Sequence, residues 1–92
     1  MLGHINIVIL GRVQGVFFRR TVKHEATRRG ISGFVKNESD GSVRIEIEGD
    51  EEKIQEFADW IKRGAGEGMH EIKDVEVATG AFKMLEGFEI GE

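Results

Sequence analysis

The sequence predicts an α+β fold in which an antiparallel sheet carries two helices on one face. Two observations support this prediction. Stretches in which apolar, mostly β-branched residues alternate with other residues are interleaved with two stretches whose apolar residues recur at helical spacing. Glycines and clusters of acidic residues stand at the junctions, where turns and helix ends are expected.

The first strand and the first helix are clearly marked. Isoleucines alternate with other residues near the N-terminus and predict a strand over about residues 4–12. Phe18, Val22 and Ala26 then recur at helical spacing. This helix is expected to end at Gly30, because two arginines precede that glycine and basic residues stabilise the last turn of a helix.

A hairpin and a second helix follow. Residues 31–37 and 43–48 are the two expected strands of the hairpin, with turn-forming residues between them at 38–41. Asp50 is placed to cap the second helix, whose first turn carries two glutamates. The buried stripe of this helix is predicted to consist of Ile54, Phe57, Ala58 and Ile61.

The end of the chain completes the sheet. A proline-free, flexible loop is expected over residues 64–68, a strand over 72–78, and a short terminal strand over 88–90 after a loose loop. Right-handed crossovers place successive helices on the same side of a sheet, so the order favours the ferredoxin-like split β-α-β (βαββαβ) sandwich. We expect residues 1–92 to form a single domain, because typical domains contain roughly 100 residues.

The composition argues against several classes of protein and of site. The chain contains no cysteine, which rules out disulfides, a thiolate nucleophile and thiolate metal ligands. A formal net charge of -4 and a pI of about 5.4 argue against a nucleic-acid partner, because such proteins present a basic surface. No apolar run reaches the ~20 residues needed to cross a bilayer, and no membrane association is expected. A cytoplasmic monomer is the default expectation.

Residues 11–19, between the first strand and the first helix, have the features of an anion-binding loop. Every residue in this segment has a backbone N–H, and the segment leads into the positive end of a helix. Gly15 lets the backbone approach a phosphate closely, and Arg19 can hold two phosphate oxygens with its planar guanidinium. The segment therefore predicts a phosphate cradle, although taken alone it could be an ordinary strand-to-helix turn.

The residues of this loop limit its chemistry. A P-loop requires Gly-Lys-Ser/Thr, whereas Gly15 is followed by Val16 and Phe17, and a cysteine phosphatase requires a cysteine. Because the loop has no hydroxyl or thiol, water is the simplest nucleophile. Asn37 is a candidate to orient that water, since a neutral amide both donates and accepts hydrogen bonds. By itself, Asn37 could equally be a turn former.

Two blocks of the sequence resemble the acylphosphatase family. Residues 11–19 match its Gly-x-Val-Gln-Gly-Val-x-(Phe/Tyr)-Arg loop. The segments Gly-Phe-Val-Lys-Asn at 33–37 and Asp-Gly-Ser-Val at 40–43 are similar to the hairpin motif of that family, and they lie at the separation from the first block that the family shows. The similarity extends over nearly the whole chain.

The resemblance implies an acylphosphatase, an enzyme that hydrolyses the carboxyl–phosphate bond of acyl phosphates to a carboxylate and inorganic phosphate without metal or cofactor. It implies that the catalytic residues are Arg19, which binds the phosphate, and Asn37, which positions the attacking water. The phosphate itself is expected to help accept a proton from that water. The implied phosphate-binding loop consists of Gln14, Gly15, Val16, Phe17, Phe18 and Arg19. Inorganic phosphate or sulfate is expected to be able to occupy it.

Two stretches depart from the family pattern. Residues 64–66 read Gly-Ala-Gly where many relatives have Gly-Pro, and the chain ends Phe-Glu-Ile-Gly-Glu without a terminal aromatic residue. These differences bear on the rigidity of the loop and the packing of the last strand. Both catalytic blocks are intact.

The two phenylalanines of the loop have simpler interpretations as well. Large apolar residues at a strand–helix junction usually belong to the core, and we expect this for Phe18. Phe17 could belong to the core or line a substrate pocket.

The histidines and two glutamates are not expected to be functional. His4, His24 and His70 are too widely spaced to suggest metal ligation, so surface or packing roles are expected and no metal is predicted. Glu46 and Glu48 lie on one face of a strand whose other face is apolar. This alternation predicts a solvated face for the two glutamates rather than a pair of acid–base carboxylates.

Two other classes of function stay open at this point. An RNA-binding domain has the same element order, and residues 33–35 faintly resemble its aromatic strand motif, but aromatic residues are few and the pI is acidic. A non-catalytic module that binds phosphate or carbamoyl phosphate is the second alternative, because acylphosphatase-like modules also occur at the start of larger maturation proteins. Phosphate would protect such a module from unfolding while its turnover stayed at background.

Overall fold

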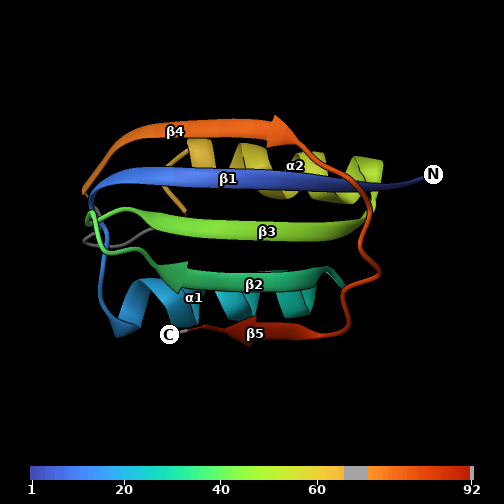
Figure 1. Cartoon of the computed structure of the whole chain (residues 1–92), viewed down its shortest axis with the longest axis horizontal. Coiled ribbons are helices and arrows are strands. Elements are labelled where there is room, and N and C mark those ends of the chain that lie inside the picture. The colour runs from blue at the N-terminus through green and yellow to red at the C-terminus, as the bar shows by residue number, and fades with distance from the viewer. Residues whose placement is uncertain (66–70, 92) are drawn as a thin grey trace.

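The computed structural model describes residues 1–65 and 71–91 and has the expected ferredoxin-like α+β architecture. A five-stranded sheet in the order β4-β1-β3-β2-β5 carries both helices on one face, with α1 behind β2 and β5 and α2 behind β1 and β4 (Figure 1). The elements are β1 (Leu2–Arg12), α1 (Val16–Arg28), β2 (Ser32–Asn37), β3 (Val43–Asp50), α2 (Glu51–Lys62), β4 (Glu71–Thr79) and β5 (Phe88–Ile90).

The sheet is mixed rather than purely antiparallel. β1 pairs antiparallel with β3 and β4, and β2 pairs antiparallel with β3, as predicted. The terminal strand β5 instead pairs parallel with β2, with Gly33 opposite Phe88. The reason is the route of the chain: residues 80–87, which we call the strap, run across one end of the sheet, so β5 starts at the same end as β2 (Figure 1).

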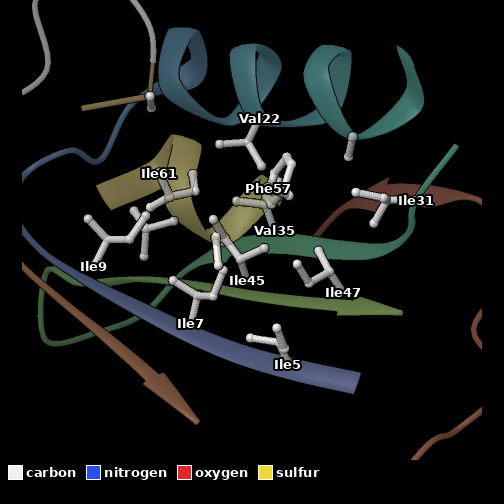
Figure 2. Close-up of a cluster of buried hydrophobic side chains, with 14 of the residues drawn as sticks. Ile5, Ile7, Ile9, Val22, Ile31, Val35, Ile45, Ile47, Phe57 and Ile61 are labelled. Atoms are coloured by element: carbon white, nitrogen blue, oxygen red, sulfur yellow. The ribbon is translucent and has the colours of Figure 1, made fainter. Parts of the chain in front are cut away.

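Alternating isoleucines build the core between the sheet and the helices. Ile5, Ile7 and Ile9 of β1 are buried and stand opposite Ile47, Ile45 and Val43 of β3 in register. Figure 2 shows the isoleucines of this set pointing toward the helices, where they meet Val22 of α1 and Phe57 and Ile61 of α2. Burial of one such side chain contributes about 1.5–3 kcal/mol, so this alternation fixes which face of each strand points inward.

The two helices begin differently. The carboxylate of Asp50 caps α2 by accepting a hydrogen bond from the Glu52 amide at 3.2 Å, and Ile54 and the rest of the predicted stripe are buried. Helix α1 begins after Gly15, and no side chain of residues 1–65 or 71–91 caps it. It ends at Arg28, close to the predicted end, and Gly30 follows with a φ of 69°. The beginning of α1 therefore differs from that of α2, which the Asp50 carboxylate caps.

The prediction of a solvated face for two glutamates is wrong. Glu46 and Glu48 are 3% and 2% exposed, and His4 beside them is 3% exposed. They do lie on the sheet face away from the helices, but the strap passes over this end of it, and the Lys83 and Leu85 amides donate to Glu48. Period-two alternation identifies the second face of a strand without indicating what covers it.

Some predictions fall on residues that are not described. The loop expected at 64–68 is described only as far as Ala65, which is buried and has a φ of 57°. The Gly-Ala-Gly departure from the family pattern is thus only partly covered, and His70 and the last residue, Glu92, lie outside the described residues.

Candidate active site

Three segments that are distant in the sequence meet at one end of the sheet. The loop from β1 to α1 lies there, next to the end of β2 and the turn that leads into β3 (Figure 1). The C-terminal segment joins them, because Gly91 follows β5 and its carbonyl oxygen accepts a hydrogen bond from Arg19 Nη1 at 3.4 Å. The two sequence blocks that carry the family resemblance therefore lie side by side.

The start of α1 is arranged to receive an anion. Gly15 has a φ of 143° and a ψ of 159°, a backbone conformation that is essentially restricted to glycine. A Cβ built at this position would meet no atom within 4 Å, so its surroundings in the described structure are open. The first turn of α1 carries no acidic residue, and no side chain in the described part of the chain caps it. The positive end of the helix is thus not neutralised by its own sequence.

The side chain of Gln14 ties the loop to the hairpin. Its Nε2 donates to the backbone carbonyls of Glu38, at 2.7 Å, and Ser42, at 3.0 Å. The Glu38 amide in turn donates to the Ser42 carbonyl at 2.9 Å, which closes the turn that these two carbonyls belong to. Sequence reasoning assigned only the backbone of Gln14 a role, since nothing in the spacing of residues reveals which carbonyls a side-chain amide will reach.

The hairpin turn has its own brace. Asp40 Oδ1 accepts hydrogen bonds from the Ser42 hydroxyl at 2.6 Å and from the Ser42 amide at 2.9 Å. These two bonds hold the pKa of Asp40 below its usual range. The turn therefore presents two fixed carbonyls to Gln14, and it fixes the end of β2, where Asn37 pairs with Val43.

Two buried polar atoms at this end of the sheet lack a partner. Within the described part of the chain, neither Arg19 Nε nor Asn37 Oδ1 has a hydrogen-bond partner, although both atoms are buried. An unsatisfied buried polar group costs about 1–3 kcal/mol, and nearly all such groups in folded proteins are paired. A donor on Arg19 and an acceptor on Asn37 are therefore available to a ligand that offers both an anionic oxygen and a hydroxyl hydrogen.

The two phenylalanines of the loop differ in burial. Phe18 is 2% exposed and belongs to the core, as predicted. Phe17 is 78% exposed, so the core interpretation that was open for it is wrong. As Phe17 follows the first residue of α1, its ring lies on the solvent side of the helix start.

Other features of the described residues bear on the class of site. Between residues 1 and 65 and between 71 and 91, no three His, Asp or Glu side chains converge as metal ligands would. His24 is exposed, and His4 has a packing role between two glutamates. None of the described helices is long and apolar enough to cross a membrane.

Comparison with known proteins shows which family the chain resembles. The acylphosphatase family model matches residues 5–90. A relative from Geobacillus kaustophilus named acylphosphatase is 47% identical over 60 residues, which is 65% of this chain and 64% of the relative, just under two thirds of its length.

Two solved structures are also similar. The crystal structure of acylphosphatase from Bacillus subtilis superposes with a TM-score of 0.88 at 36% identity and covers 100% of both chains. Full-length HypF in its phosphate- and nucleotide-bound form matches with a TM-score of 0.90 at 32% identity, covering 100% of this chain and 12% of HypF. With both motif blocks adjacent in space and the family model spanning nearly its full length, the chain belongs to the acylphosphatase family.

Proposed function

We propose that this protein is an acylphosphatase that hydrolyses acyl phosphates by attack of water at phosphorus, with the phosphate held by Arg19 and the loop amides and the water oriented by Asn37. The observation that carries the proposal is that two buried atoms, Arg19 Nε and Asn37 Oδ1, have no hydrogen-bond partner among the described residues. They lie beside a helix start that no described side chain caps. Family membership supports the activity, and relatives that carry this name support the substrate class.

The phosphate is bound by charge and by backbone donors. The guanidinium of Arg19 offers donors in a planar fork that suits two phosphate oxygens, and Nε has no competing partner among the described residues. The backbone amides of residues 14–19 lie at the positive end of α1 and offer further donors, although the Arg19 amide also donates to the Gly15 carbonyl at 3.5 Å. Charge that spreads over the equatorial oxygens in the transition state is stabilised by the same groups, so they lower the barrier as well as bind the substrate.

The attacking water is positioned by an acceptor rather than activated by a base. Asn37 Oδ1 accepts one hydrogen of the water, which directs its lone pair toward phosphorus. The new P–O bond forms as the bond from phosphorus to the carboxyl oxygen breaks, and the carboxylate leaves with that electron pair. The second water proton passes to a phosphate oxygen, so the products are a carboxylate and dihydrogen phosphate. Such a good leaving group needs no general acid, and we expect phosphate monoesters to be poor substrates.

The first experiment measures both the bond cleaved and its metal dependence. Wild type is incubated with benzoyl phosphate in excess EDTA and oxygen-18-enriched water, with p-nitrophenyl phosphate as the monoester control. We expect turnover of the anhydride alone, with the heavy oxygen in inorganic phosphate. Heavy oxygen in benzoate would place the attack at carbon, and a wild type without turnover would contradict the proposal.

A second candidate is a module that binds phosphate or carbamoyl phosphate without turnover. The observation that favours it is the similarity to HypF, a much longer protein whose structure is of a phosphate- and nucleotide-bound form. For such a module, inorganic phosphate would raise the midpoint of thermal unfolding while hydrolysis stayed at background. Parallel melting and turnover measurements therefore separate the two candidates.

Further proposals concern partners and place of action. We propose a monomer without a nucleic-acid partner, acting in the cytoplasm. The strap lies over one end of the sheet face that RNA-recognition domains use to stack bases, which argues against RNA there. Light scattering after gel filtration checks the oligomeric state, and salt-dependent retention of RNA on a filter would contradict the second statement.

A further inference from the structure

A network of titratable side chains lies on the sheet face opposite the helices. His4 of β1 lies between two glutamates of β3, with Nδ1 at 2.7 Å from Glu48 Oε2 and Nε2 at 3.0 Å from Glu46 Oε1. All three side chains are almost fully buried. Charged groups are seldom buried unless they are paired and hydrogen-bonded, and none of these takes part in the mechanism proposed above.

Glu48 binds the backbone of the strap. Its carboxylate accepts hydrogen bonds from the amide of Lys83 and, at 2.6 Å, from the amide of Leu85. Burial raises the pKa of Glu48, but these amide bonds and the contact with His4 outweigh burial and hold the pKa below its usual range. The carboxylate is therefore an ionised anchor, and hydrogen bonds to charged groups are roughly twice as strong as neutral ones.

The strap is fixed at both ends as well as in the middle. At its start, the Gly80 amide donates to the His4 carbonyl at 3.0 Å, and at its end the Gly33 amide donates to the Gly87 carbonyl at 2.8 Å. Beyond Gly87 the chain enters β5, which is an edge strand of three residues. Such a short strand has few hydrogen bonds of its own, so its position depends on what holds the segment that leads into it.

The residue that follows β5 contacts Arg19. The Gly91 amide donates to the Val35 carbonyl at 2.7 Å, which extends the pairing with β2, and the Gly91 carbonyl accepts from Arg19 Nη1 at 3.4 Å. Hydrogen bonds thus hold the backbone of residues 83–91 at several points between Glu48 and the Arg19 guanidinium. Figure 1 shows the strap at one end of the sheet and β5 running from there toward the end at which α1 starts.

We propose that Glu48 is a positioning residue for Arg19, acting through the strap and β5. Anchoring the middle of the strap lowers the conformational entropy lost when β5 pairs with β2, and β5 then restrains the guanidinium before phosphate arrives. The proposal rests on the function proposed above, because it assigns Glu48 a part in the same site.

The test compares two isosteric variants of one strand. Glu48→Gln replaces one of the two carboxylate oxygens with an NH2 donor, so that only one of the Lys83 and Leu85 amides keeps an acceptor. Glu46→Gln is the matched control. Glu46 is equally buried and contacts the strap only through the flexible side chain of Lys83. In the described structure it accepts from the side chains of His4, Lys83 and Arg44 and from no strap amide. We expect Glu48→Gln to shift or broaden the NMR signal of Arg19 Nε–H and to raise the inhibition constant for inorganic phosphate by on the order of fivefold. Glu46→Gln should leave both within twofold of wild type.

A measurement on wild type decides the case if Glu48→Gln does not fold. If an ordered strap favours phosphate binding, phosphate must favour the ordered strap to the same extent. Saturating inorganic phosphate should therefore slow hydrogen exchange at the Lys83 and Leu85 amides more than at the amides of β4, the opposite edge strand.

Failure of this proposal is distinct from failure of the proposed function. A wild type that neither hydrolyses acyl phosphate nor binds phosphate would contradict the proposed function. The Arg19 Nε–H signal in Glu48→Gln would still test whether Glu48 affects the position of Arg19. An unchanged signal in a folded Glu48→Gln, or strap exchange that phosphate leaves unchanged while it binds, would overturn the proposal.

Discussion

Removing the side chain of Gln14 tests whether the phosphate loop and the Asn37 hairpin must be held together. Gln14→Ala keeps the backbone N–H of the loop and deletes only the donor that bridges the Glu38 and Ser42 carbonyls, at 2.7 and 3.0 Å. A typical hydrogen bond contributes about 0.5–1.5 kcal/mol net. Because both carbonyls can gain water when the side chain is gone, we expect a loss of about 1–2 kcal/mol.

If the lost energy of about 1–2 kcal/mol held the loop in its alignment with Asn37, transition-state stabilisation should weaken by the same amount. The value of kcat/KM for benzoyl phosphate should then drop about 5- to 30-fold, since each 1.36 kcal/mol is tenfold in rate. Gln14→Glu should lose more, because an acceptor would then face two carbonyls. Gln55→Ala on α2 is the matched control: it removes a single exposed bond to Asp59 at 3.2 Å, far from the loop. Steady-state kinetics with urea unfolding of each variant separates alignment from stability. A folded Gln14→Ala with kcat/KM within twofold of wild type would refute the reasoning.

Three further predictions concern single features of the fold. Gly15→Ala should lower stability by about 1–3 kcal/mol through backbone strain alone and reduce kcat at least tenfold, as urea unfolding and kinetics would show. Phe18→Ala should cost about 3–5 kcal/mol in urea unfolding, whereas Phe17→Ala should cost under about 0.5 kcal/mol. Because the pKa of Glu48 is lowered in the fold, its stabilisation is present above the unfolded pKa of about 4.3 and is lost as pH falls through the folded pKa. The urea concentration at the unfolding midpoint should therefore decrease as the pH is lowered below about 4. The decrease should be steeper in wild type than in Glu48→Gln.

Much of the fold is predictable because it depends on local patterns. Alternating isoleucines and the helical stripe fix the inward faces of β1, β3 and α2, and the core has these residues. The placement of Phe18 follows from the same logic. The parallel pairing of β5 could not be predicted, because it depends on the path of the strap rather than on the composition of the strand.

The burial of Glu46 and Glu48 shows the same limit at the level of side chains. Their alternation with isoleucines places them correctly on the second face of β3, but the strap that covers them is held by backbone amides, which every sequence contains. His4 is drawn into this network by its register opposite Glu48. A buried pair of titratable side chains on neighbouring strands can thus be recognised only when the strand register is known.

The features of the site also fall into those that the sequence predicts and those that it does not. Sequence motifs identified the loop and Asn37, and the structure brings these blocks together at one end of the sheet. The tether made by Gln14 and the contact of Arg19 with Gly91 were not predicted, since both join a side chain to a backbone carbonyl far along the chain. Side chain-to-backbone bonds of this kind leave no spacing signature.

The central claim is that Arg19 holds the phosphate while Asn37 orients the water, and these roles differ in their effect on binding. Calorimetric titration with inorganic phosphate, alongside kcat for benzoyl phosphate, separates them in Arg19→Ala and Asn37→Ala. We predict that Arg19→Ala loses both phosphate affinity and turnover, whereas Asn37→Ala keeps phosphate affinity within about threefold and loses kcat by at least 100-fold, on the scale of other oriented catalytic groups. Full phosphate affinity in Arg19→Ala, or wild-type kcat in Asn37→Ala, would contradict the account.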